Sequence, residues 1–206
     1  MNKNKYKNFI GFIKKNRNTI ITILCFVTGI VLFAVFVKAR LNILANDASY
    51  KLTIASNYIA NNNIEQGFGI IDDIIDQYSN TTASYRARFM KATHLISEKQ
   101  YEQAEVLLKY IIDNGKPKTV RPLAYPSLIL IYEETGSFDK AIEYSNMFLN
   151  LYSDNYLVPS VMENLARFYK VTNKVEQAND IYQKIKDNYP NSEYSVRAEQ
   201  NLNDKK

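Results

Sequence analysis

A four-residue pattern recurs along this chain at a fixed interval. Each copy is a large apolar residue, an acid, a Gln or Lys, and a very small residue, and successive copies begin 37 positions apart. The four copies begin at Ile64, Tyr101, Phe138 and Val175. Self-similarity at a period of about 20–50 residues is typical of solenoids and related arrays. We therefore expect one structural unit, repeated four times and stacked on its neighbours.

Other positions keep the same register and indicate two helices in each unit. Small or aliphatic residues precede each copy by nine positions, and a Tyr or Leu precedes it by six. The first set is Ala55, Ala92, Ile129 and Ala166, and the second is Tyr58, Leu95, Tyr132 and Tyr169. The second helix begins at the pattern and carries its small residue on one apolar stripe: Gly67, Ala104, Ala141 or Ala178. Two helices approach closely only where a side chain is nearly absent, so a large residue there should cost about 1–3 kcal/mol.

These small and aromatic positions, together with a closing Pro190, resemble the tetratricopeptide repeat (TPR) family over about residues 46–190. The period exceeds the common TPR length of about 34 residues, which lengthens each turn between repeats. Ser145 departs from the pattern, because the other copies of its position are apolar. The resemblance implies an all-α fold, an α-solenoid of about four helix pairs at 46–190. A capping helix and tail at 191–206 are expected to follow, with Ser192 as its N-cap.

The N-terminal segment indicates a membrane anchor. Residues 18–37 carry no charge, and about 20 apolar residues in a helix cross a hydrocarbon core of about 30 Å. The alternative is a cleaved signal peptide, whose apolar region would span about 7–15 residues and end in a small-x-small site. Here the run is longer, and Lys38 and Arg40 follow it directly. No Gly or Pro lies between Ile30 and Gln66, so residues 38–45 should continue the span into the first repeat helix.

The charge is distributed unevenly between the two parts of the chain. Residues 1–40 hold eight Lys or Arg and no acid, so the remainder carries 5 − 8 = −3 of the net charge of +5. A nucleic-acid partner would require the basic surface on the folded part, so none is expected. The positive-inside rule places the basic tail, residues 1–17, in the cytoplasm. It places the repeats on the periplasmic or extracytoplasmic side of a bacterial inner membrane. The tail itself fits an amphipathic helix or a disordered segment equally well.

Prolines mark the joint between the second and third repeats as the expected bend of the array. Pro122 and Pro159, 37 positions apart, suit the first turn of their helices, where a missing N–H costs nothing. Pro126 lies one turn later and should kink or delay its helix. The bend is expected around residues 114–126.

The sequence offers no catalytic constellation. His94 is the single histidine, and the single cysteine, Cys25, lies within the apolar run. With no second His or Cys to join it, His94 is interpreted as structural rather than as a metal ligand or base. We therefore expect no catalytic, cofactor or metal site and no enzymatic activity.

The remaining candidate site is a surface for other proteins. In TPR-like arrays the first helices line the concave side, and projection of this spacing predicts an apolar centre with charged ends. The projected residues are Leu52, Arg86, Phe89, Thr93, Ile96, Leu123, Leu130, Glu133, Glu163, Arg167 and Lys170. Such a groove suits an extended segment or a helix of a partner. The alternative is that Phe89 and Leu130 simply pack between helices.

The layout of the chain suggests two functional settings. One span followed directly by a repeat array resembles the ancillary subunit of the SecYEG translocon, which implies an adaptor working with translocon and periplasmic chaperones. The stretch from Ile181 to Ser192 instead resembles TPR proteins of outer-membrane assembly and of the Tol-Pal system. That resemblance implies a scaffold for envelope assembly or cell division.

Overall fold

The computed structural model describes residues 15–203 of the chain. Regular secondary structure within this range consists of nine α-helices, α2 to α10, and one 3₁₀ helix, η1. The chain divides into two compact units, residues 1–47 and 48–206, and each is considered by itself. Most of the predicted basic tail, residues 1–14, and the last three residues of the predicted tail lie outside the described residues.

Helix α2 (Arg17–Ala60) supplies the described part of the first unit. Large apolar side chains from Ile20 to Phe36 are exposed along it. An 18-residue window of this helix has a mean hydropathy of 3.0. Among the described helices, α2 alone has the length and composition to cross a membrane, and a signal sequence would meet the same test.

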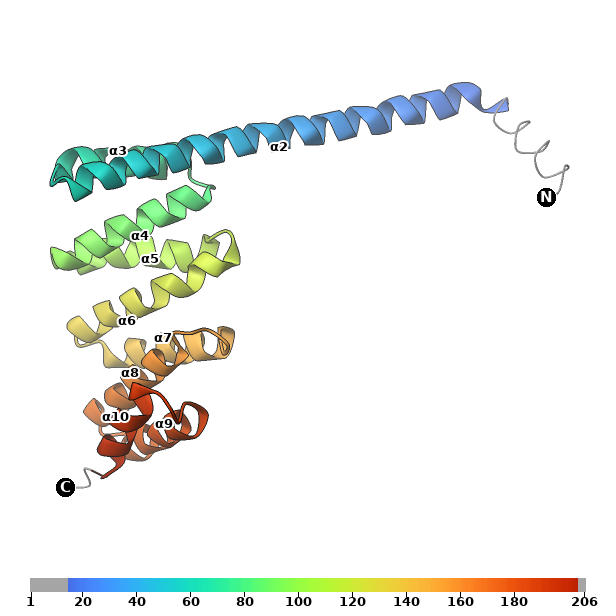
Figure 1. The fold of residues 1–206 in the computed structure, drawn as a ribbon. Coiled ribbons are helices and arrows are strands. Elements are labelled where there is room, and N and C mark those ends of the chain that lie inside the picture. Colours follow the sequence, from blue (N-terminus) through green and yellow to red (C-terminus); the bar gives the residue numbers. More distant parts are fainter. Residues whose placement is uncertain (1–14, 204–206) are drawn as a thin grey trace, which may run out of the picture. The chain divides into compact units, whose positions relative to one another are not determined.

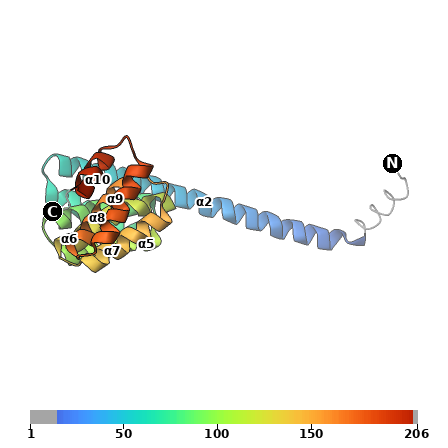
Figure 2. The same cartoon turned by 90° about the horizontal axis from the view of Figure 1, so that it is seen from below.

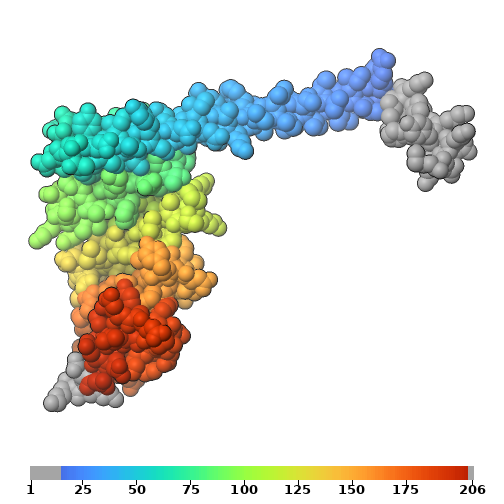
Figure 3. Space-filling view, in the orientation of Figure 1, coloured from blue at the N-terminus to red at the C-terminus, as the bar shows by residue number. Residues whose placement is uncertain are grey.

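The second unit is a stack of antiparallel helix pairs, as the repeat predicts. It contains the end of α2 and the following helices: α3 (Ile64–Gln77), α4 (Thr82–Ser97), α5 (Tyr101–Asn114), α6 (Ala124–Glu134), α7 (Phe138–Leu151), α8 (Val158–Val171), α9 (Val175–Asn188) and α10 (Glu193–Asn203). The pairs follow one another in sequence order from α3 to α10 (Figure 1), and from below they lie over one another (Figure 2). In the space-filling view their side chains form continuous layers from green to red (Figure 3). The all-α repeat fold is thus confirmed.

The second helix of each repeat begins at the first residue of the sequence pattern. Helices α3, α5, α7 and α9 start at Ile64, Tyr101, Phe138 and Val175. Two residues earlier, each turn holds a residue in the left-handed region; these are Asn62 (φ 63°), Lys99 (φ 58°), Gly136 (φ 67°) and Asn173 (φ 58°). The next amide donates a hydrogen bond of 2.7–2.9 Å to the carbonyl of the Tyr or Leu five residues before it. This arrangement is the Schellman motif, so the 37-residue period also fixes the backbone of the turns.

The small residues of the pattern lie where the helices of a pair approach most closely. Gly67, Ala104, Ala141 and Ala178 are all buried. A Cβ added to Gly67 would lie 2.5 Å from Cγ1 of Ile59 and 3.1 Å from the carbonyl oxygen of Ala55. Ser145, the polar departure from the pattern, is fully buried but donates a hydrogen bond of 2.7 Å to the carbonyl of Ala141. A buried hydroxyl that is satisfied within its own helix is compatible with close packing.

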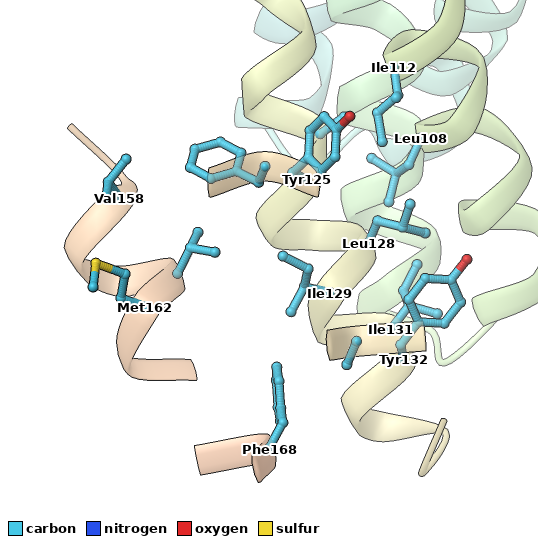
Figure 4. Close-up of a cluster of buried hydrophobic side chains, with 14 of the residues drawn as sticks. Leu108, Ile112, Tyr125, Leu128, Ile129, Ile131, Tyr132, Val158, Met162 and Phe168 are labelled. Carbon is cyan, nitrogen blue, oxygen red and sulfur yellow. The ribbon is translucent and has the colours of Figure 1, made fainter. Parts of the chain in front are cut away.

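Apolar side chains from three successive layers form the centre of the core. Figure 4 shows residues of α6, among them Tyr125, Leu128 and Ile129, between α5 and α8. Leu108 of α5 and Phe168 of α8 are each fully buried on either side. Each layer therefore buries the apolar face of the next. Such burial by a neighbour is needed because a single repeat is too small to bury its own apolar face.

The proline-rich joint departs from one expectation. Residues Lys118–Leu123 form η1, and α6 begins only at Ala124. Pro122 consequently lies in the 3₁₀ helix and not in the first turn of an α-helix, which corrects the prediction. Pro126 explains why α6 begins only at Ala124. The proline ring would clash with the carbonyl of residue 122 in a continuous α-helix, but it fits the first turn of α6, where no backbone N–H is needed. Pro159 lies in the first turn of α8, as expected.

The array ends in the short helix α10. Ser192 precedes it, and its hydroxyl accepts a hydrogen bond of 3.2 Å from the amide of Ser195, which is the capping interaction expected of that residue. Ala198 is buried against α9, and Tyr194 and Leu202 pack partly against the core. The exposed residues of the helix are mostly polar.

Candidate protein-binding groove

The first helices of the repeats (the end of α2, then α4, α6, α8 and α10) carry nearly all of the projected groove residues; Leu123 lies at the end of η1. The structure divides these residues into two groups. The apolar ones near α2 and α4 line open space, whereas the charged ones on α6 and α8 pair with neighbouring helices.

A cavity of about 290 Å³ lies between the end of α2, α4 and η1. Four projected residues line it: Leu52, Arg86, Phe89 and Leu123. Its other lining residues are Ser56, Tyr85, Met90, Ile111 and Val120. All of these belong to the second unit. The cavity is therefore a hollow of the repeat array itself.

A second, more open depression of about 470 Å³ lies next to the first along α4. The two share Phe89 and Met90. The remaining residues around the second depression are Ile59, Ile64, Phe68, Thr93, His94 and Ser97. Both hollows are lined by residues of α4, and the two together are here named the α2–α4 groove.

The polar groups in the α2–α4 groove are few and mostly satisfied. The hydroxyl of Ser56 donates to the carbonyl of Leu52 at 2.8 Å, and that of Thr93 donates to Phe89 at 2.9 Å. The ring of His94 stacks on Phe68 with centroids 4.3 Å apart, as expected of a structural histidine. The groove can bury apolar side chains, but it presents no nucleophile paired with a base. Within the described residues no cluster of His, Cys, Asp or Glu could hold a metal.

All of the charged residues predicted for the groove except Arg86 instead join successive first helices. Arg167 of α8 donates to Glu133 of α6 at 2.8 Å, and Arg197 of α10 donates to Glu163 of α8 at 3.1 Å. Lys170 of α8 donates to the side-chain oxygen of Asn201 at 3.0 Å. Both ion pairs connect residues 34 positions apart, so they form a ladder from α6 to α10.

This pairing shifts the pKa values of its members. The hydrogen bond from Arg167 lowers the pKa of Glu133, and the same bond raises the pKa of the Arg167 guanidinium. The hydrogen bond to Glu163 raises the pKa of Arg197. These charges are therefore stabilised as ions by one another, which leaves them less available to a partner than the sequence suggested.

The ladder cannot extend to the start of the array. Three periods before Glu163 and Arg167 stand Leu52 and Ser56, and two periods before them stand Phe89 and Thr93. None of these four side chains can form an ion pair. At the joint between α2 and α4, Leu52 thus stands in the register of Glu163, so Arg86, in the register of Arg197, has no acid there. The groove opens at this joint.

Two of the projected apolar residues also line neither hollow. Ile96 packs partly against the core, and Leu130 of α6 is 41% exposed. Conversely, the projection missed Ser56, Tyr85 and Met90, which line the first cavity. Met90 directly follows the predicted Phe89, and this adjacency was the signal that the sequence offered.

Comparisons with known proteins agree with this geometry. The model of a tetratricopeptide repeat-like domain matches residues 11–147, and that of a tetratricopeptide repeat matches residues 161–192. No curated protein matches the chain.

Several solved structures share the fold. One is a kinesin light chain of Podosopora anserina with nearly identical TPR-like repeats, 14% identical, covering 77% of this chain and 84% of its own, with a TM-score of 0.57. Another is MamA of AMB-1, 15% identical, covering 73% and 77%, with a TM-score of 0.54. A third is a MamA variant of RS-1, 16% identical, covering 77% and 79%, with a TM-score of 0.55. At such identities the likeness concerns the fold alone. Because the first family model covers well over half of the sequence, the chain belongs to the family of tetratricopeptide repeat-like domain proteins.

Proposed function

We propose that this chain is a membrane-tethered adaptor that binds segments of other proteins in the α2–α4 groove. Proteins built from these repeats are generally non-catalytic scaffolds for other proteins. The observation that carries the proposal is the apolar groove, whose lining includes Leu52, Phe89 and Met90. Grooves of this kind accept an extended segment or an amphipathic helix.

The tether is helix α2. The family match begins at residue 11 and continues through the apolar stretch into the repeats. This favours an apolar helix that belongs to the mature protein over a leader that is removed. Flanking charge gives the orientation: the Lys and Arg residues that precede the span exceed those that follow it. The repeats would then act on the extracytoplasmic side of a bacterial inner membrane.

The setting follows from that placement. A tethered protein-binding array beside the membrane suits an ancillary role at the Sec translocon, together with periplasmic chaperones that receive emerging chains. The second candidate is a scaffold for envelope assembly or cell division. It is favoured by the resemblance of the last repeat, around Ile181 to Ser192, to TPR proteins of those systems.

Crosslinking in intact membranes followed by mass spectrometry separates the two candidates. Recovery of channel proteins of the translocon would support the first, and recovery of only peptidoglycan-associated or outer-membrane partners would replace it with the second. If no protein is recovered under conditions in which a known membrane adaptor captures its partner, the adaptor function itself is contradicted.

Topology has its own test. A reporter active only in the periplasm, fused after Lys206, should be active in cells. An inactive fusion, with activity from the matching cytoplasmic reporter, would reverse the orientation.

A further inference from the structure

Charge is segregated between the two helix layers in the half of the array that holds the groove. The first-helix segments here, residues 48–60, 82–97 and 115–134, contain seven Lys or Arg and two acids, Glu133 and Glu134, both in the last turn of α6. The cations are Lys51, Arg86, Arg88, Lys91, Lys116, Lys118 and Arg121. The second helices of the same half, α3 and α5, carry seven acids and one lysine. Of these cations, Arg86 lines the groove itself.

Some of these cations serve the fold. Arg88 is buried, donates to the carbonyl of Ile75 at 3.2 Å, and lies 4.3 Å from the centre of the Tyr110 ring. Lys91 pairs with Asp72 of α3. These two side chains are directed into contacts with the second helices and are not available to a partner.

Other cations remain accessible at one end of the groove. Arg86 lines the cavity, is exposed, and has no hydrogen-bond acceptor or ion-pair partner within residues 15–203. Lys116 and Lys118 are also exposed. The backbone carbonyl of Lys116 accepts a hydrogen bond of 3.4 Å from the hydroxyl of Thr82, which precedes Arg86 by one turn of α4. The end of the groove nearest η1 is thus cationic, while its length is apolar.

We infer that the occupant of the α2–α4 groove is an acidic polypeptide segment whose apolar side chains alternate with carboxylates. The inference deepens the protein-binding function proposed above and rests on it. Apolar side chains fill the hollows beside Phe89 and Met90, and carboxylates meet Arg86, Lys116 and Lys118. A cationic apolar segment would face like charge at the same end, so the groove selects against it.

The later half of the array supports this assignment by contrast. There the first helices α8 and α10 carry both signs of charge, and their ion pairs satisfy each other. A bound acid would have to displace Glu163 from Arg197 or Glu133 from Arg167. Acid recognition is therefore assigned to the end of the groove at Arg86, which has no carboxylate partner among residues 15–203.

The test uses the full chain in detergent and two fluorescent peptides measured by anisotropy. One peptide is composed of Leu, Phe, Asp and Glu, and its control replaces each acid with the corresponding amide. We expect the acidic peptide to bind about tenfold more tightly at low salt, from a few screened ion pairs. The preference should shrink as added salt shortens the screening length. Equal binding of the two peptides would overturn the acidic assignment but leave protein binding in place.

Variants locate the effect. Arg86→Gln and Lys118→Gln should each weaken the acidic peptide about two- to fivefold without changing the control peptide. Lys184→Gln, an exposed lysine of the distant helix α9, should change neither. Ser56→Leu fills the groove and should abolish binding of the acidic peptide while the far-UV circular dichroism spectrum is retained. Two outcomes contradict the inference. One is that Lys184→Gln loses the preference for the acidic peptide over the amide control; the other is that Arg86→Gln and Lys118→Gln both keep it in full.

An anionic lipid is the competing ligand with related chemistry. A short-chain anionic phospholipid kept below its micelle concentration should not displace the acidic peptide. Complete displacement by the lipid, with no displacement by a zwitterionic analogue, would assign the groove to a lipid headgroup and overturn the assignment to a polypeptide. Membrane crosslinking, which reports on proteins of any charge, tests the adaptor function separately.

Discussion

Two glycines of α3 offer a matched test of the close helix approach on which the array depends. Gly67 and Gly69 lie two residues apart in the same helix. A Cβ on Gly67 would lie 2.5 Å from Cγ1 of Ile59, 3.1 Å from the Ala55 carbonyl and 3.2 Å from the Ile59 nitrogen. A Cβ on Gly69 would meet nothing within 4 Å. Both positions should gain the same helix propensity on substitution by alanine, so their difference isolates the packing term.

The magnitudes follow from that geometry. Gly69→Ala should stabilise the array by about 0.5–1 kcal/mol, the propensity difference between Gly and Ala in a helix. Gly67→Ala gains the same amount, but it must push α3 away from backbone atoms of α2 that cannot rotate aside. Overpacking of this kind costs about 1–3 kcal/mol, so the variant should be unchanged or destabilised by up to about 2 kcal/mol. The two variants should thus differ by about 1–3 kcal/mol.

The assay is urea unfolding of the full chain in detergent, followed by circular dichroism at 222 nm, with amide hydrogen exchange of α3 as a local readout. Hydrogen exchange is needed because repeat arrays can lose a terminal unit before the rest. A difference of 1 kcal/mol also shifts the melting temperature of a domain of this size by about 2–4 °C. Equal stabilisation by the two substitutions would refute the reasoning, because it would mean that α2 and α3 do not approach at Gly67.

Three further predictions concern the turns, the ion ladder and the buried arginine. Lys99→Gly should stabilise the chain by about 0.5–1 kcal/mol, because lysine holds a left-handed φ that glycine adopts without strain; thermal unfolding checks this. Arg167→Gln should lose about 0.5 kcal/mol at neutral pH. Since Arg167 lowers the pKa of Glu133, that contribution exists above the unfolded pKa of about 4.3 and disappears as pH falls through the folded value. Urea midpoints of variant and parent should therefore converge by about pH 3. Arg88→Met should cost about 1–2 kcal/mol, since a carbonyl at the end of α3 loses its donor; unchanged urea stability would contradict this.

The sequence was most informative where the repeat itself carried the signal. The start of each second helix could be predicted because the small residue and the apolar stripe recur together, and packing leaves few alternatives at such a position. The Schellman turns were less visible. In three of the four turns the left-handed residue is an Asn or Gly (Asn62, Gly136 and Asn173), the residue types that favour this conformation. In the fourth turn it is Lys99, whose conformation is determined by the repeat and not by its residue type.

The candidate site could be predicted only in part. Leu52, Phe89 and Leu123 line the first cavity, whereas the pairing of Glu133, Glu163 and Arg167 with neighbouring helices was not part of the projection. Glu163 and Arg197 are 34 positions apart, although the repeat period is 37. Their pairing therefore depends on how far α10 is displaced along α8. That displacement is a property of helix stacking and not of any single repeat. For the same reason, the depth of the hollow beside Met90 could not be predicted from the sequence.

The groove can be tested most directly by placing a photoreactive side chain at two exposed positions in turn. Thr93 lies in the α2–α4 groove, whereas Val106 on α5 is 68% exposed and lines neither hollow. After irradiation of intact membranes, the account predicts discrete crosslinked adducts to other proteins from position 93 and none from position 106. Adducts of equal yield from both positions, or from position 106 alone, would contradict the claim that the α2–α4 groove is where this chain binds its partners.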